Sequence, residues 1–159
     1  MNLSTLSVRQ FKDLLVKTAY YPHPSIATGS VICSAAAGPA DTDNSRIYLH
    51  PRARLDVTAD IIIGQWVMIG GGAHILTHTH DFAGTEPLLL KSARDPVAFT
   101  IPLSKDIRDD VWIFSSVVLP KCRFIAKGVL IGTGSIVSKD ITEPYTIWAG
   151  NPARQIGMR

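Results

Sequence analysis

Residues 107–141 read IRDDVWIFSSVVLPKCRFIAKGVLIGTGSIVSKDI, and an aliphatic residue returns at every sixth position of this stretch. These positions are Ile107, Ile113, Leu119, Ile125, Ile131 and Val137. An α-helix repeats apolar residues about every 3.6 positions and a half-buried strand every second position, so neither explains the pattern. A sixfold repeat, often with Gly directly after the aliphatic residue, is instead typical of a parallel β-helix built from hexapeptides.

A second block with the same period lies upstream, where Val57, Ile63, Ile69 and Ile75 fall six apart. Two residues before the aliphatic positions lies a further register of mostly small or β-branched residues: Leu55, Ile61, Val67, Ala73, Val111, Val117, Val129 and Ser135. Three hexapeptides are expected to form one triangular turn of about 18 residues that advances about 4.8 Å, the ordinary strand spacing. We therefore predict an internal column of sixth-residue aliphatics, stabilised by the stacking of neighbouring turns.

The period divides the chain into three parts. Residues 1–46 are predicted to form a short helix and a loop, because Ser7 and Gln10 resemble a capping box and an apolar i, i+3, i+4 stripe follows. We expect this segment to cap the open end of the solenoid. Hexapeptides fill residues 47–142, and residues 143–159 form a non-repetitive tail.

Residues 81–104 interrupt the hexapeptides. The period vanishes there, and Pro87, Pro96 and Pro102 punctuate the segment. We predict one long irregular loop, and loops of this length inside a compact domain are usually functional.

The composition of the chain restricts its function. With 159 residues, 46% hydrophobic and 18% charged, it is expected to form one globular domain. A scattered net charge of +3 gives no reason to expect a nucleic-acid partner, although it suits a small anionic ligand. No apolar run is long enough for a membrane span, and Lys12 and Asp13 interrupt the place of a signal peptide, so we expect a cytoplasmic protein. Cys33 and Cys122 lack C-x-x-C spacing and indicate neither a disulfide framework nor a thiolate zinc site.

Three segments resemble the hexapeptide acyltransferases, and the similarity spans residues 47–156. They are LTHTHDF at 76–82, GTGSIVSKD at 132–140 and AGNPAR at 149–154. The branch that the chain resembles most holds maltose, galactoside and surface-polysaccharide O-acetyltransferases. The resemblance implies an all-β fold, a left-handed parallel β-helix of hexapeptides with a short N-terminal helix and one long inserted loop. It also implies a homotrimer with active sites between subunits, acetyl-CoA as cosubstrate, a small carbohydrate acceptor and no metal.

His80 is the candidate catalytic residue. A hydroxyl is a poor nucleophile until a base removes its proton, and histidine is the side chain whose pKa suits that work near neutral pH. His80 is the last residue before the long loop, where an acceptor can enter, and it matches the catalytic histidine of the family that the chain resembles. We therefore predict that His80 is the general base.

By the same resemblance, residues of the second block and the tail form the cofactor groove. The residues that align with coenzyme A-binding positions are Ser115, Thr133, Ser138, Lys139 and Arg154. Residues 143–159 are thereby predicted to complete the cofactor site.

Three further residues are weaker candidates for contact with the acceptor. His78 lies two residues before His80 and, in an extended segment, projects from the same side, so it would orient His80 or touch the acceptor. Trp112 matches an aromatic residue beside the site in relatives, and His50 lies on an early turn that faces the acceptor pocket of sugar-modifying relatives.

Three alternative functions stay open at this stage. N-acetylation of an amino sugar or antibiotic would use His80 in the same way. A γ-type carbonic anhydrase shares this solenoid, but its zinc ligands require a histidine spacing that His74, His78 and His80 do not have. A non-catalytic solenoid that only binds partners would not need His80 together with Lys139 and Arg154.

Overall fold

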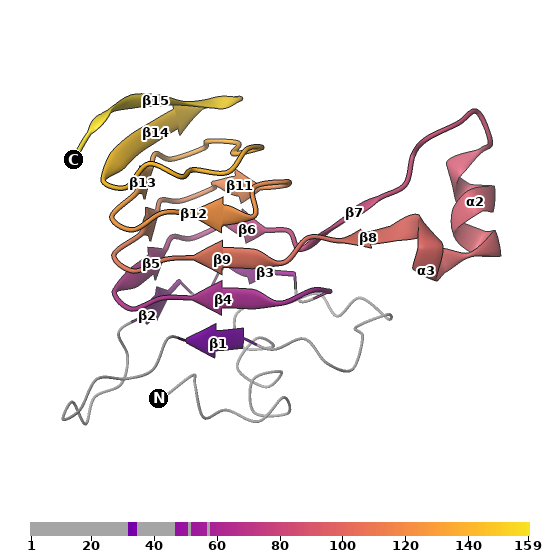
Figure 1. Ribbon diagram of the computed structural model, residues 1–159, viewed down its shortest axis with the longest axis horizontal. Helices are drawn as coiled ribbons and strands as arrows, with labels where there is room; N and C mark the ends of the chain where they lie inside the picture. The colour runs from indigo at the N-terminus through magenta and orange to yellow at the C-terminus, as the bar shows by residue number, and fades with distance from the viewer. Residues whose placement is uncertain (1–31, 35–46, 51, 57) are drawn as a thin grey trace.

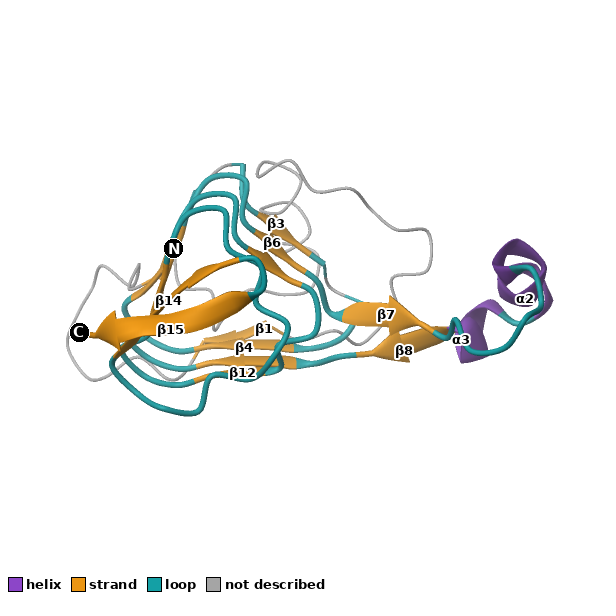
Figure 2. Ribbon diagram, turned by 90° about the horizontal axis from the view of Figure 1, so that it is seen from above, coloured by secondary structure: helices purple, strands orange, loops and turns teal. Residues whose placement is uncertain are grey.

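The computed structural model describes residues 32–34, 47–50, 52–56 and 58–159. The helix predicted near the N-terminus lies outside the described residues. Where the structure describes the chain, it winds into stacked coils with a roughly triangular profile, and one arm projects from a corner (Figures 1 and 2). Short strands that pair almost entirely in parallel form the three sides, as a hexapeptide solenoid requires. The left-handed winding implied by the resemblance stays a prediction.

Each side of the solenoid is one sheet. Sheet A has the order β1 (Ile32–Ser34), β4 (Ile61–Ile63), β9 (Lys105–Ile107) and β12 (Phe124–Ile125). Sheet B has the order β2 (Ile47–Leu49), β5 (Val67–Ile69), β10 (Trp112–Ile113), β13 (Leu130–Ile131), β14 (Thr146–Gly150) and β15 (Ala153–Met158). Sheet C has the order β3 (Arg54–Leu55), β6 (His74–Ile75) and β11 (Val118–Leu119). The chain visits the sheets in the order A, B, C, so we name the corners A–B, B–C and C–A.

The predicted aliphatic column is confirmed in the second block. Ile107 pairs with Ile125 and Ile113 with Ile131, each 18 residues further along the chain. All six sixth-residue aliphatics of this block are at most 2% exposed, and the small-residue register before them is equally buried. Burial of one aliphatic side chain from each side of every coil is therefore what holds the stack together.

The first described coil departs from the predicted length of 18 residues. Leu55 pairs with Ile75, 20 residues later, and Leu49 pairs with Ile69 at the same separation. Leu55 thus takes the column position predicted for Val57, which lies outside the described residues. The extra residues fall in the C–A corner, because the buried positions Leu55 and Ile63 are eight apart, whereas Leu119 and Ile125 are six apart.

The corners carry a left-handed backbone residue that recurs from coil to coil. At the A–B corner these residues are Trp66, Asp110, Gly128 and Tyr145, and at the B–C corner they are Gly72, Ser116 and Gly134. The Gly that follows a column residue has a different purpose. A Cβ on Gly70 would lie 2.7 Å from the backbone nitrogen of Ser115, so Gly70 lets adjacent coils approach each other.

The segment between the two blocks is not the irregular loop that the sequence predicted. β7 (His78–His80) and β8 (Thr100–Pro102) form an antiparallel hairpin that carries α2 (Leu88–Arg94) and α3 (Pro96–Phe99). We call residues 78–102 the arm; it extends away from the coils (Figure 1). The prediction failed because it treated proline only as a breaker. Pro96 is in the first turn of α3, and the Asp95 side chain accepts a hydrogen bond from the Ala98 backbone at 2.9 Å.

The tail predicted from residue 143 also contains regular structure. β14 continues sheet B in parallel, and β15 folds back antiparallel to it at the sheet edge. Within the described part of the chain, no helix has the length and apolar character to span a membrane.

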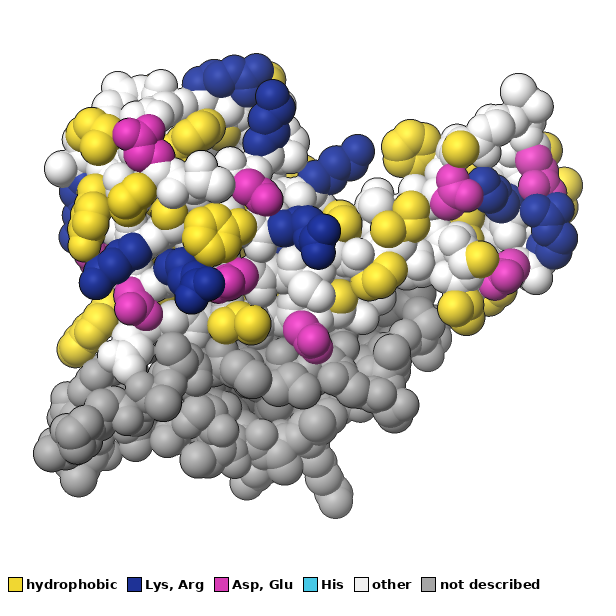
Figure 3. All heavy atoms as spheres, in the orientation of Figure 1, with side chains coloured by type: hydrophobic (Ala, Val, Ile, Leu, Met, Phe, Trp, Pro, Cys, Tyr) yellow, Lys and Arg dark blue, Asp and Glu magenta, His cyan; other side chains and the backbone are white. Residues whose placement is uncertain are grey.

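Charged and apolar groups are distributed differently over the solenoid and the arm. On the face in Figure 3, side chains of Lys and Arg interleave with those of Asp and Glu over the coils. Hydrophobic side chains lie at the surface of the arm, where Leu89 is 81% and Val97 82% exposed. This apolar exposure is confined to neither helix, and it bears on assembly below.

Candidate active site

His80 lies at the end of β7, on the first strand of the arm. β7 and β8 pair so that His80 faces Thr100, which places Phe99 beside the histidine. The His80 imidazole stacks on the Phe99 ring with centroids 4.7 Å apart, and the His78 ring lies edge-on to it at 5.0 Å. His80 is nevertheless exposed, so an aromatic platform holds its ring while solvent and ligands reach it.

His78 forms a hydrogen-bonded pair with Asp56. Its Nδ1 lies 2.5 Å from Oδ2 of Asp56, which also accepts the backbone N–H of Thr77 at 2.9 Å. The other carboxylate oxygen accepts from the hydroxyl of Thr58 at 2.6 Å. Burial by itself would raise the pKa of Asp56, but these hydrogen bonds and the charge of His78 lower it below its usual value. An ionised carboxylate only accepts hydrogen bonds, so Nδ1 of His78 carries the proton that they share.

The sequence gave no reason to single out Asp56. It follows β3 in the C–A corner that is two residues longer than the hexapeptide pattern, and that corner brings it to the arm. The available signal was the doubtful register of this coil, in which Leu55 rather than Val57 belongs to the column.

The five predicted cofactor residues lie along the later coils. Ser115 and Thr133 are exposed on successive turns of the B–C corner, where the Gly134 N–H donates to the Ser115 carbonyl at 3.0 Å. Ser138 and Lys139 are exposed directly after the buried Val137. Arg154 lies on β15, which is joined to the same side of the solenoid where the Ala153 N–H donates to the Ile136 carbonyl at 2.9 Å.

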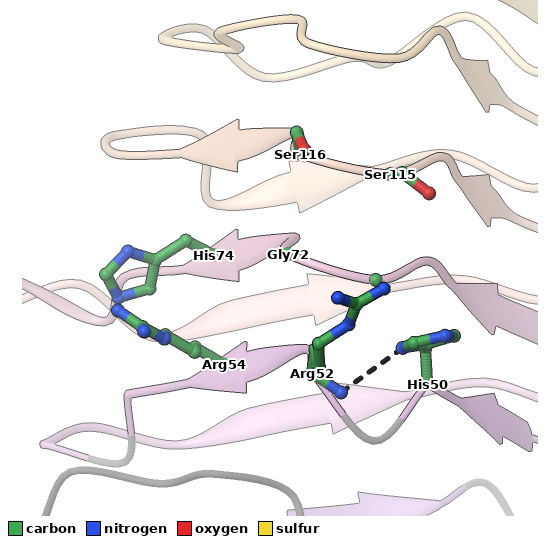
Figure 4. A pocket seen from close by; sticks show the side chains of 8 residues that line it. His50, Arg52, Arg54, Gly72, His74, Ser115 and Ser116 are labelled. Carbon is green, nitrogen blue, oxygen red and sulfur yellow. Dashed lines mark hydrogen bonds between the residues drawn. The ribbon is translucent and has the colours of Figure 1, made fainter.

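The remaining acceptor candidates occupy two different places. Trp112 points outward from β10 and stacks on Phe114, with ring centroids 4.2 Å apart. His50 follows β2 and lines a cavity of about 620 Å³ on the side of the solenoid formed by sheet C (Figure 4). The other lining residues are Arg52, Arg54, Gly71, Gly72, His74, Ser115 and Ser116. Ser115 is therefore common to the cavity and to the predicted cofactor groove.

Neither thiol chemistry nor a metal centre emerges from the part of the chain that the structure describes. Burial raises the pKa of the Cys122 thiol to about 12, so this cysteine is a core residue and not a nucleophile. No three side chains of His, Cys, Asp or Glu come together there as metal ligands would.

Comparison with known proteins agrees with this architecture. A chloramphenicol acetyltransferase from Escherichia coli is 32% identical over 161 residues, which cover 94% of this chain and 74% of the relative. The chain belongs to the hexapeptide-repeat acetyltransferase family.

Further comparisons place this family member among its relatives. A chloramphenicol acetyltransferase from Morganella morganii is 36% identical over 129 residues, 74% of this chain, although the match spans only 59% of that relative. Among solved structures, a hexapeptide-repeat acetyltransferase from Vibrio cholerae, complexed with acetyl-CoA, superimposes with a TM-score of 0.63. That match has 21% identity and covers 99% of this chain and 81% of the other. No family model matches the chain.

Proposed function

We propose that this hexapeptide-repeat acetyltransferase moves an acetyl group from acetyl-CoA to a hydroxyl of a sugar or saccharide, with His80 as general base. The observation that carries the proposal is the His80 ring itself, exposed at the start of the arm and held against Phe99. The acetyl-CoA bound in the related Vibrio cholerae structure supports the choice of donor.

The proposed reaction is a direct transfer in a ternary complex. His80 accepts the proton of the acceptor hydroxyl as its oxygen forms a bond to the thioester carbonyl carbon. The carbon–sulfur bond then breaks, and the protonated imidazole returns its proton to the departing thiolate of coenzyme A. His78, fixed by Asp56, holds the orientation of the neighbouring His80 ring through their edge-on contact.

We assign the cofactor to the later coils. Ser115, Thr133 and Ser138 offer hydroxyls on one side of the solenoid, and Lys139 and Arg154 offer positive charge for the phosphates of coenzyme A. Residues 143–159 would thus complete the cofactor site through β15.

We further propose a homotrimer whose active sites lie between subunits. The outward positions Tyr48, Met68 and Trp112 are aligned in adjacent strands of sheet B and are exposed in the single chain. Together with the apolar arm, this column is the kind of surface that a second copy of the chain would bury.

An antibiotic is a second candidate acceptor. The names of the Escherichia coli and Morganella morganii relatives favour it, and chloramphenicol offers hydroxyl groups but no free amine. N-acetylation of an amino sugar or of another antibiotic uses the same base. Screening acetyl-CoA against saccharides, chloramphenicol and aminoglycosides, with release of free coenzyme A as the signal, distinguishes the three classes.

The test of the mechanism is His80→Ala, measured with whichever acceptor is active in that screen. We expect kcat to fall at least about a hundredfold, the typical contribution of a general base, while the affinity for acetyl-CoA changes little. Thr79→Ala, on the same strand between the two histidines, is the matched control and should keep its activity. A larger loss of kcat in His78→Ala than in His80→Ala would move the role of base to His78.

A further inference from the structure

The cavity of about 620 Å³ is lined by groups that donate hydrogen bonds and carry positive charge. Arg52 and Arg54 alternate with the buried Ala53 and Leu55, so both guanidinium groups are on the outer side of one coil. Figure 4 shows Arg54 next to His74 of the following coil, and Arg52 next to His50. Ser115 and Ser116 come from the coil after that.

His50 is held as a donor toward this cavity. The Arg52 backbone N–H donates to Nδ1 of His50 at 3.2 Å, so a neutral ring carries its proton on Nε2. A Cβ on Gly71 would lie 2.9 Å from the same Nδ1, so the missing side chain gives the imidazole its place.

The charge of the lining has one sign. None of the eight lining residues is Asp or Glu. Asp56 is the acidic group that acts on His74, but its carboxylate is bound by Thr58, Thr77 and His78. Burial, and then the charge of Arg54, lowers the pKa of His74, so the positive charge of the cavity comes from the two arginines.

We infer that this cavity binds the phosphate group of a ligand other than acetyl-CoA. Its donors come from three successive coils, and a tetrahedral phosphate offers oxygens in the directions that such a cage requires, whereas a planar carboxylate does not. The volume is that of a small-molecule site and not of a single ion.

The position of the cavity relative to the cofactor residues identifies this ligand further. The cavity begins at His50 and ends at Ser115 and Ser116, while the proposed cofactor residues continue from Ser115 to Arg154. If the proposed function holds, the ligand beside the cofactor groove is the acceptor, and the acceptor is a phosphorylated or nucleotide-linked saccharide. Chloramphenicol, which has no such group, would then be a poor substrate.

The test is calorimetric titration of the whole chain with pyrophosphate at low ionic strength, which requires no acetyl transfer. We expect wild-type protein to bind pyrophosphate more tightly than malonate, and Arg52→Gln/Arg54→Gln to weaken pyrophosphate binding at least about tenfold. Arg108→Gln removes a guanidinium near sheet A, where it pairs with Asp106 at 2.9 Å, and should bind as wild type does. Saturating acetyl-CoA should leave the pyrophosphate affinity within about threefold.

Four results would overturn the inference: absence of pyrophosphate binding, equal affinity in all three proteins, preference for malonate, or displacement by acetyl-CoA. The last result would assign the arginines to the cofactor. Melting temperatures check that the variants fold, and the single variant Arg52→Gln, at an exposed position, replaces the double variant if that one does not. Because His80→Ala should still bind pyrophosphate, a failed transferase assay and a failed phosphate site give different outcomes.

Discussion

Two neighbouring histidines on the same strand have different environments. His78 is bound to a buried carboxylate, while His80 rests on an aromatic ring and meets solvent. A histidine paired with an ionised aspartate has a fixed ring, whereas one that only stacks is able to accept a proton from a ligand. This division of labour is what the single residues contribute to the proposed site.

The first prediction at this scale concerns Asp56→Asn and acid stability. The pKa of Asp56 is lower folded than unfolded, so its contribution to stability is present above the unfolded value near 3.8 and disappears as the pH falls through the folded one. We expect the variant to be about 1 to 2 kcal/mol less stable at pH 7, from hydrogen bonds to a charged group. Urea unfolding from neutral pH down to the acid limit of the folded state measures the difference, which should narrow on acidification. A difference independent of pH would contradict the ionised state of Asp56.

The sequence predicted some of these residues and missed others for a physical reason. His80 could be predicted because its chemistry and its place before a break in the period point the same way. Asp56 could not, because its contact with His78 depends on a corner that breaks the period. Arg52 and His74 meet in one cavity only because a 20-residue coil brings them into adjacent layers.

Among the elements, the arm differs from every coil in having no interior of its own. Neither α2 nor α3 has a buried residue, and the apolar side chains of Leu89 and Val97 face solvent in the single chain. Short helices of this kind are marginal in isolation, so their stability must come from packing on something else. The proposed neighbour subunit supplies that surface.

A prediction about assembly follows from the arm. The wild-type protein should sediment at three times the chain mass of 17.3 kDa, and Leu89→Asp/Val97→Asp should weaken association at least about tenfold because charge would enter an apolar contact. Ile156→Asp changes an exposed apolar residue of β15 and is the control, expected to stay trimeric. Analytical ultracentrifugation over a concentration series decides; a wild-type monomer, or an arm variant that remains trimeric, would refute the arm as an interface.

The elements differed in how far sequence could predict them. The strands of the second block follow the sixfold period closely, since each column residue is both a pattern position and a buried one. The helices of the arm have no such repeat, and their start signals, Asp95 followed by Pro96, were outweighed by the reading of proline as a break.

At the scale of the whole molecule, stability comes from columns that run through every coil. Ile113 lies between Ile69 of the coil before and Ile131 of the coil after, and all three are fully buried. Because each coil is too short to be stable alone, loss of contact at one level affects both of its neighbours.

We therefore predict that Ile113→Ala lowers the free energy of unfolding by about 2 to 5 kcal/mol, the usual cost of a large-to-small core change. Val118→Ala, at a half-buried outward position of sheet C, is the matched control and should cost less than about 1 kcal/mol. Urea unfolding of both variants measures the difference. Equal losses in the two would show that the inward column is not the principal source of stability.

The separation between inward and outward positions has an evolutionary consequence. Arg52 and Arg54 alternate along the chain with Ala53 and Leu55, which face the interior. Substitutions at the outward positions can alter what the surface recognises while the interior contacts remain as they were. A lineage built on this scaffold is thus free to acquire new specificities by point mutation, with little selection against them from folding.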